Sequence, residues 1–299
     1  PGFVECSNHS DIFHELILVN NTGIYFMKFS LWRQYGSLNS GPVWDAFEQG
    51  AKALGHSIVY NKENADVDVI WSVLWNGRMA PNHKIWRWCK QNQKPVIVLE
   101  VGAIQRGTTW RIGLGGINRN AYFAPGGNSD SRASSLGLTL RPWRNNGDHI
   151  LICGQHEKSQ QWQSMPPISK WLTDTVSKIK QYSNRTIVFR PHPRSPLTQL
   201  TELDNVVVQR PQKKSGTYDD FDIKFDKAWA VVCESSNPGP QAVINGIPAF
   251  VSTSSLAYDV ANTDLANIEN PCMPYRQQWL NDYAHTEHTL SEIQQGIPL

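Results

Sequence analysis

The sequence predicts an α/β protein built from two Rossmann-like, doubly wound domains with a cleft between them. The chain has 299 residues, more than one hydrophobic core usually holds, and this length favours two domains of ~100–200 residues. Short β-branched runs alternate with helical patterns, an order that is typical of parallel sheets. The alternation stops over residues 102–146 and restarts near residue 148, so the pattern divides the chain in two.

The first half carries repeated strand and helix patterns between residues 15 and 125. The predicted elements are strand 24–29, helix 42–54, strand 56–60, strand 67–74, helix 82–91 and strand 94–101. Pro42 in the first turn and Gly55 after the last one are ordinary helix boundary residues. The last three elements predict a βαβ unit of a parallel sheet.

The second half repeats this alternation and ends in a helical pattern. The predicted elements are strand 149–153, helix 168–182, strands 186–189, 206–209 and 228–233, helix 240–245, strand 249–251 and a helical tail 274–296. We therefore expect an acceptor-side domain over 1–147, a second domain over 148–273, and a C-terminal helical segment, 274–299, that packs back toward the first domain.

Composition and charge exclude several classes of protein. A net charge of +2 is too small for a dedicated nucleic-acid-binding domain. The five cysteines are far apart and form no CxxC pair, so they indicate neither a disulfide framework nor a zinc site. Apolar runs such as residues 95–99 are too short to span a membrane. We expect a cytoplasmic protein with no membrane partner.

The segment Val188-Phe-Arg-Pro-His-Pro-Arg194 places Arg190, His192 and Arg194 directly after a buried strand. Open α/β sheets bind ligands at the carboxyl ends of their strands, and arginine forks grip phosphate there. The structural alternative is a loop fixed by proline whose arginine side chains are solvated.

A second motif runs from Val231 to Phe250 as strand, polar loop, helix start and strand. Ser235 and Ser236 at the start of a helix predict an anion site for a diphosphate. The structural alternative is simple helix capping by serine or asparagine. Glu234 offers a carboxylate for ribose or sugar hydroxyl groups.

These two motifs, RPHPR and CESSNPGPQAVINGIPAF, resemble the C-terminal domain of GT-B glycosyltransferases of the phage and capsule-polysaccharide types. The ending that begins at Gln278 resembles the "WL..LA..QWT..EI..G" tail of phage glycosyltransferases, with Glu287-His288 where that tail has Gln-Trp. Residues 71–82, 94–102 and 106–111 are similar to phage enzymes that add a sugar to 5-hydroxymethylpyrimidines in DNA. The resemblance covers most of residues 25–296.

The resemblance implies a UDP-sugar donor on the second domain and an acceptor on the first. It places the donor at Gly154, Gln155, Arg190, His192, Arg194, Ser235 and Ser236. Glu234, Asn237 and Gln241, which lie in the same second motif, complete the expected donor-binding set. It also implies double-stranded DNA with hydroxymethylated cytosine or uracil as the acceptor, in the cytoplasm of a phage-infected host cell.

Direct sugar transfer needs a base for the acceptor hydroxyl and positive groups for the leaving diphosphate. Glu100, at the end of a buried strand, is the candidate base, with Asp45 as a weaker one and His192 as an alternative catalytic acid. A purely structural Glu100 would pair with Arg106 or Arg111. One such base, with no obvious nucleophile, favours inversion.

The acidic pairs Asp66/Asp68 and Asp219/Asp220 lie at a strand start and in a loop, unlike a metal-binding DxD motif. We therefore expect no obligatory metal and leave open a stimulatory divalent cation.

For the DNA acceptor, cationic side chains and tryptophans alternate in the first half. Cations neutralise phosphates, and an aromatic ring can stack on a base that has been flipped out. The candidates are Trp75, Arg78, Arg106, Trp110 and Arg111. The structural alternative for each tryptophan is ordinary packing.

Three other functions fit the same motifs. A transferase with the same donor site can act on a cell-surface polysaccharide or lipid-linked glycan. A non-catalytic nucleotide-sugar-binding module would tolerate the loss of Glu100. An epimerase of the same fold is the third alternative.

Overall fold

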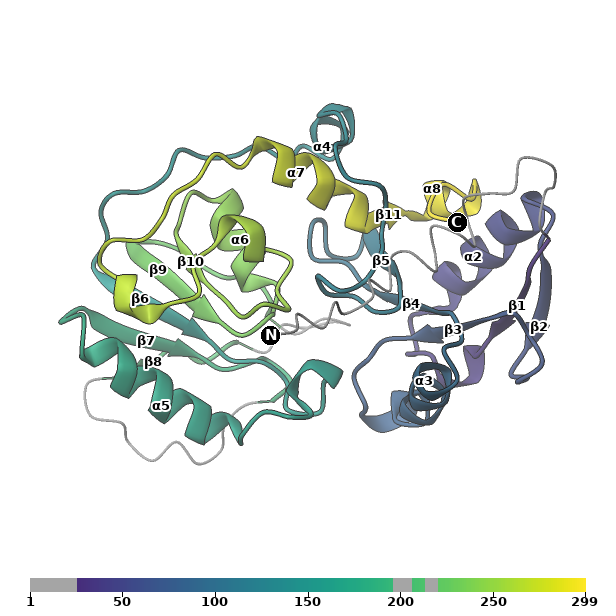
Figure 1. Ribbon diagram of the computed structural model, residues 1–299, viewed down its shortest axis with the longest axis horizontal. Coiled ribbons are helices and arrows are strands. Elements are labelled where there is room, and N and C mark those ends of the chain that lie inside the picture. Colours follow the sequence, from purple (N-terminus) through teal and green to yellow (C-terminus); the bar gives the residue numbers. More distant parts are fainter. Residues whose placement is uncertain (1–25, 196–205, 213–219) are drawn as a thin grey trace, which may run out of the picture.

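The computed structural model describes residues 26–195, 206–212 and 220–299. Within these ranges two sheets with flanking helices form two lobes that lie side by side (Figure 1). Residues 24 and 25 of the first predicted strand lie outside the described residues. No helix in the described part of the chain is long and apolar enough to cross a membrane.

The first lobe is built on a mixed sheet in the order β11-β5-β4-β3-β1-β2. Its strands are β1 (Lys28–Leu31), β2 (Ser57–Tyr60), β3 (Val67–Trp71), β4 (Val96–Val101), β5 (Thr109–Leu114) and β11 (Glu287–Thr289). β1 to β4 are parallel, whereas β5 is antiparallel to both β4 and β11. The predicted βαβ unit is present as β3, a helix and β4.

Helices cover both faces of the first sheet. They are α2 (Gly41–Ala53) and α3 (Asn82–Gln91). Successive strand residues point to opposite faces, so Val69 of β3 joins the core that contains Phe47 of α2. The next residue, Ile70, joins the core that contains Ile85 of α3. This is the doubly wound arrangement that the sequence predicts.

The second lobe is built on a parallel sheet in the order β10-β9-β6-β7-β8. Its elements are β6 (His149–Cys153), α5 (Ile168–Lys180), β7 (Thr186–Arg190), β8 (Val206–Val208), β9 (Ala228–Cys233), α6 (Pro238–Ile244) and β10 (Ala249–Phe250). Ile150 and Ile152 of β6 pack with Leu172 of α5, whereas Leu151 packs with Val243 of α6 on the other face.

Two predicted stretches differ in the structure. The segment 102–146, expected to be loop, contains β5 and a short helix, α4 (Ser131–Ser135). The tail is not one helical segment but α7 (Gln277–Tyr283), then β11, then α8 (Leu290–Gln294). Thr289 and Glu292 form a capping box that starts α8, and this T-x-x-E pattern is the local signal for the break.

The tail crosses from the second lobe to the first (Figure 1). β11 pairs with β5 at the sheet edge, and Ile293 of α8 packs in the core under α2. A side chain at Gly50 would lie 2.2 Å from the carbonyl oxygen of Ile293, so glycine allows this close approach. The domain boundaries at 147/148 and 273/274 stay predictions.

Candidate active site

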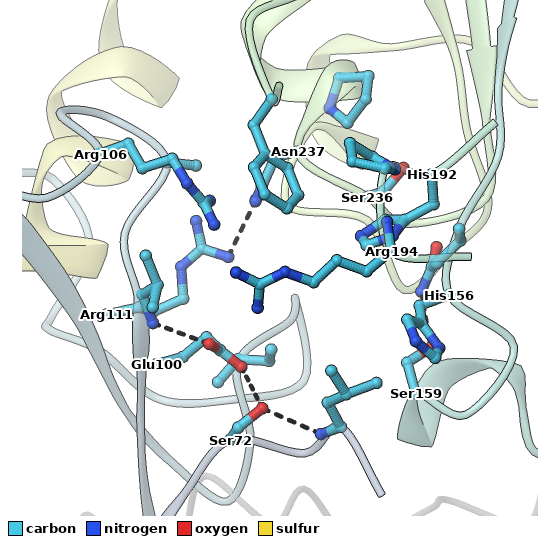
Figure 2. A pocket seen from close by; sticks show the side chains of 18 of the residues that line it. Ser72, Glu100, Arg106, Arg111, His156, Ser159, His192, Arg194, Ser236 and Asn237 are labelled. Carbon is cyan, nitrogen blue, oxygen red and sulfur yellow. Dashed lines mark hydrogen bonds between the residues drawn. The ribbon is translucent and has the colours of Figure 1, made fainter. Parts of the chain in front are cut away.

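A cleft of about 640 Å³ lies between the two sheets. Its walls include the carboxyl ends of β3, β4, β6 and β7, and the turn between β9 and α6. Open α/β sheets bind ligands at this position. The cleft is therefore the candidate active site (Figure 2).

Glu100, the candidate base, lies on the first-lobe wall near the end of β4. Its Oε2 accepts a 2.5 Å hydrogen bond from the Ser72 hydroxyl, and its Oε1 accepts one of 2.8 Å from the Val101 N–H. The ion pair of Arg111 is with Glu287, although Arg111 is also attracted electrostatically by Glu100. Glu100 is thus oriented by neutral donors and borders the cleft.

Ser72 is a cleft residue that the sequence reasoning missed. It follows β3 with a left-handed backbone, φ 65°, and is 2% exposed. Its N–H donates to the Leu99 carbonyl at 2.7 Å, and its hydroxyl accepts the Leu74 N–H at 3.0 Å. These bonds leave the hydroxyl hydrogen directed at Glu100. A non-glycine residue at positive φ is often found at a functional site.

Two histidines lie on the second-lobe wall. The Nδ1 of His192 accepts the Arg194 N–H at 3.1 Å, and the Nδ1 of His156 accepts the Lys158 N–H at 3.1 Å. A nitrogen that accepts a hydrogen bond is unprotonated, so each neutral ring carries its proton on Nε2. Burial and the positive charges of Lys158 and Arg194 lower the pKa of His156, against a smaller opposing effect of Glu157.

The ring centroids of the two histidines are 5.4 Å apart, so both rings line one part of the cleft. The sequence reasoning found His192 and missed His156. The only local signal for His156 is its place just after the first strand of the second half, next to Gly154 and Gln155.

Arg190 does not offer its guanidinium to the cleft as expected. The side chain is 7% exposed, and its Nη2 donates to the carbonyl oxygens of Asp220 at 3.1 Å and Asp222 at 3.0 Å. It also pairs with the Asp220 carboxylate at 3.2 Å. Arg190 therefore fixes the segment that carries Phe221, a residue of the cleft wall.

Phe221 lies between cations of the two lobes. The guanidinium carbon of Arg106 is 3.7 Å from its ring centroid and that of Arg194 is 5.6 Å away. Figure 2 shows the Arg194 side chain pointing into the pocket. Of the two arginines of RPHPR that we expected at the phosphate position, only Arg194 directs its guanidinium into the cleft.

Gln155 and Gly154 form part of the second-lobe wall of the cleft. The Gln155 Oε1 accepts both the N–H and the hydroxyl of Ser235 at 3.3 Å. Gln155 therefore positions Ser235, and both residues line the cleft with Gly154. A side chain at Gly154 would lie 3.3 Å from the Phe189 ring, a tight contact.

The start of α6 differs from the anion site that was expected. Ser236, Asn237 and Gln241 line the cleft, but Pro238 and Pro240 have no N–H. The N–H between them, on Gly239, donates to the Ser236 carbonyl at 3.1 Å. No side chain caps this helix, so the capping alternative is not seen either.

Glu234 and Asp45 lie away from the cleft lining. Burial raises the pKa of Glu234, and a hydrogen bond with Ser252 partly offsets this. Asp45 is on α2, 59% exposed, and pairs with Arg33 at 2.5 Å. Neither side chain borders the cleft, so Asp45 is not placed to act as a base there.

Most of the residues expected to contact DNA are not on an open surface. Trp75 is 8% exposed and stacks on His83, and Arg111 is 3% exposed. Trp110 packs against the first-lobe core. Arg78 is exposed and Arg106 lines the cleft. The packing alternative therefore describes both tryptophans.

Among the described residues, no three His, Cys, Asp or Glu side chains are placed to hold a metal ion. Asp219, one of the acidic residues discussed above, lies outside the described residues.

No protein-family model and no curated protein matches the chain. The solved structures do match: the chain has a mixed α/β, glycosyltransferase-like fold. The β-Kdo 2,7 transferase of KpsC from Thermosulfurimonas dismutans is similar, with a TM-score of 0.52 and 15% identity over 90% of this chain and 98% of that chain. The β-Kdo 2,4 transferase of the same KpsC gives a TM-score of 0.47 and 11% identity over the same shares.

Proposed function

We propose that this chain is a GT-B type glycosyltransferase that binds a nucleotide-activated sugar, such as a UDP-sugar, in the cleft. The observation that carries the proposal is one oriented carboxylate, Glu100, on the first-lobe wall, with His156, His192 and Arg194 on the second. A glycosyltransferase-like fold supports it. Both walls are formed at strand ends, where such sheets bind nucleotides.

The reaction follows from these groups. Glu100 accepts the proton of an acceptor hydroxyl while that oxygen bonds to the anomeric carbon of the sugar. The bond from that carbon to the phosphate oxygen breaks, and the nucleotide leaves as a diphosphate anion. Arg194 and the Nε2–H groups of His156 and His192 stabilise the negative charge that develops. A single displacement of this kind inverts the anomeric centre.

For the acceptor, the geometry favours a glycan hydroxyl over a base in DNA. Trp75 and Arg111 are buried, so they cannot reach a duplex without rearrangement. A structural neighbour is a Kdo transferase of KpsC. The DNA acceptor remains the second candidate because residues 71–82, 94–102 and 106–111 resemble phage enzymes that glycosylate hydroxymethylpyrimidines.

The test is an incubation of the purified protein with a panel of nucleotide-sugars and three acceptor classes, followed by mass spectrometry. The acceptors are DNA with 5-hydroxymethylcytosine, DNA with 5-hydroxymethyluracil, and capsule-type oligosaccharides. The mass gained identifies the sugar, and the acceptor that gains it decides between the two candidates.

Glu100→Gln is the matched variant. Loss of a general base lowers kcat by about 10²–10⁴-fold and leaves nucleotide binding unchanged. Nucleotide binding without transfer to any acceptor would favour the non-catalytic module. Conversion of the free nucleotide-sugar into its epimer would favour the epimerase.

A further inference from the structure

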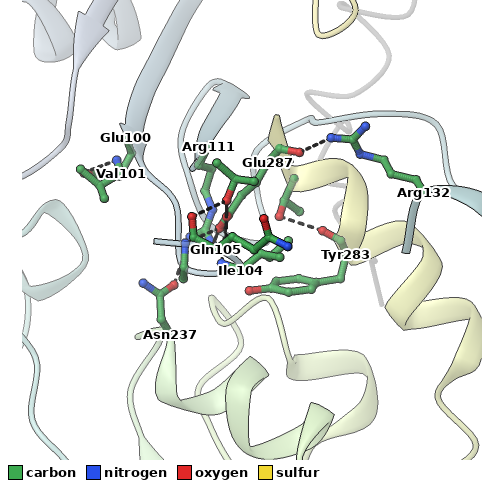
Figure 3. A network of polar contacts seen from close by, with 12 residues as sticks. Glu100, Val101, Ile104, Gln105, Arg111, Arg132, Asn237, Tyr283 and Glu287 are labelled. Atoms are coloured by element: carbon green, nitrogen blue, oxygen red, sulfur yellow. Dashed lines mark hydrogen bonds and ion pairs between the residues drawn. The ribbon is translucent and has the colours of Figure 1, made fainter. Parts of the chain in front are cut away.

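A carboxylate from the far end of the chain is buried beside the candidate active site. Glu287 lies on β11, is 0% exposed and packs against the segment that follows β4 (Figure 3). Burying a charge is unfavourable unless it is paired and hydrogen-bonded. The contacts of Glu287 therefore indicate what it does.

Among the described residues, four donors saturate this carboxylate. Its Oε1 accepts the Ala103 N–H and the Arg111 Nη2, both at 2.8 Å. Its Oε2 accepts the Ile104 N–H at 2.9 Å and the Thr109 hydroxyl at 2.8 Å. Each oxygen of a carboxylate accepts about two hydrogen bonds, so all the acceptor positions are used.

Two of these donors are backbone groups of the cleft wall. Ala103 and Ile104 line the cleft, three and four residues after Glu100 and just before Arg106. The chain passes so close to the carboxylate that a side chain at Gly102 would lie 2.4 Å from Oε2. Glu287 thus acts as the anchor for the turn that joins the candidate base to Arg106.

The contact with Arg111 connects Glu287 to the second lobe. Arg111 pairs with Glu287 at 2.8 Å, and its Nη1 donates to the Asn237 Oδ1 of the second lobe at 3.3 Å. Burial lowers the pKa of Arg111, but the interactions with Glu287, Tyr283 and Glu100 together outweigh burial, and the pKa is raised. The tail is thereby linked to the start of α6 through one guanidinium.

Arg132 fixes the backbone around Glu287. Arg132 of α4 donates to the carbonyl oxygens of Glu287, at 2.5 Å, and Ala284, at 2.8 Å, and pairs with Glu292. The backbone of the tail is therefore fixed independently of the Glu287 side chain.

We propose that Glu287 is a positioning residue of the candidate active site. It sets the backbone after Glu100 and the guanidinium of Arg111, so the C-terminal tail completes the first-lobe wall of the cleft. The kinetic part of the test rests on the proposed function; the backbone part does not.

The test compares Glu287→Ala and Glu287→Gln with Glu292→Gln by hydrogen exchange of the 103 and 104 amides and by steady-state kinetics. Hydrogen bonds to a charged group are worth ~1.5–3 kcal/mol, so in Glu287→Ala these two amides exchange about 10–100-fold faster. A displaced catalytic group lowers kcat by about 10²-fold, while the donor KM is unchanged. Glu287→Gln keeps one acceptor oxygen, so its amide exchange rates and its kcat lie between those of Glu287→Ala and the unmodified protein.

Glu292→Gln is the control, because it weakens the same tail without contacting the cleft wall. It lowers the Tm and leaves amide exchange at 103 and 104 and kcat unchanged. If Glu287→Ala does not fold, Glu287→Gln carries the test. Unchanged exchange at both amides in a folded Glu287 variant overturns the proposal. Absence of transfer in the unmodified protein refutes the proposed function alone, because the exchange result is read independently.

Discussion

The hydroxyl of Ser72 donates a 2.5 Å hydrogen bond to Oε2 of Glu100. Ser72 does so from a left-handed backbone conformation, φ 65°, which is energetically unfavourable for residues that have a Cβ atom. This strained conformation places a neutral hydrogen-bond donor against the candidate base. The hydroxyl orients the carboxylate without itself adding a positive charge that would weaken it as a base.

Ser72→Ala and Ser72→Gly separate the two roles of this residue. Both remove the hydrogen bond to Glu100, so both lower kcat. Glycine adopts positive φ without strain, so Ser72→Gly is more stable than Ser72→Ala by about 1 kcal/mol. Urea unfolding of the two variants measures this difference. Equal stability, or full activity in either variant, would contradict this role of Ser72.

Arg190→Lys tests whether this arginine holds the chain or the substrate. Lysine cannot span both carbonyl oxygens of Asp220 and Asp222, so we expect a loss of about 3 kcal/mol in the free energy of unfolding. Thermal unfolding without ligand measures it. A variant with unchanged Tm and weakened nucleotide binding would instead indicate a direct phosphate contact.

The buried His288 predicts a loss of stability on acidification. Burial, with smaller effects of Arg132 and His285 and against an opposing effect of Glu292, lowers its pKa from 6.5 to about 4. Between pH 6.5 and 4 the unfolded chain binds a proton that the folded chain does not. Folding stability therefore decreases as the pH is lowered through this range. The full loss is about 3 kcal/mol.

His288→Gln removes this contribution. Its free energy of unfolding changes less between pH 7 and pH 4.5 than that of the unmodified protein, as urea titrations at each pH can show. Equal pH dependence in the two proteins would mean that His288 titrates normally. Burial opposes the shift, but Arg132 is the chief cause that lowers the pKa of Glu292 to about 2. Glu292 therefore loses its contribution to folding stability only below pH 4.5.

Metal removal is the fourth test. In the proposed reaction, cationic side chains and Nε2–H groups stabilise the leaving diphosphate, so we expect transfer to continue after dialysis against EDTA. Rates are compared before and after dialysis, and again after Mg²⁺ or Mn²⁺ is added back. A rate that disappears with EDTA and returns with the metal would refute metal-independent transfer.

Local patterns predicted most of the elements. The helix 82–91 and the strands 149–153 and 228–233 have the same bounds in the structure, because their apolar periodicity and boundary residues lie within the segment itself. β11 was missed because three residues carry little pattern. These residues form a strand because they pair with β5, which lies far away in the sequence.

The structure brings several of the candidate site residues together in one cleft, but the contacts of individual residues differ from those that the sequence suggests. Residues at or just after the ends of strands, such as Glu100 and His192, line the cleft, because parallel strands end at one edge. Arg190 and Arg111 look equally suited to bind phosphate in the sequence, but their partners are distant carbonyl and carboxylate oxygens. Nothing local to Ser72 indicates a left-handed backbone.

The pairing of β11 with β5 also constrains the order in which the protein can mature on the ribosome. Glu287 follows Arg111 by 176 residues, which takes roughly 10–35 s to translate at ordinary rates. During that interval the first lobe has an unpaired edge strand and a buried arginine without its counter-ion. We therefore expect the nascent first lobe to depend on chaperones that shield exposed strand edges until the tail is released.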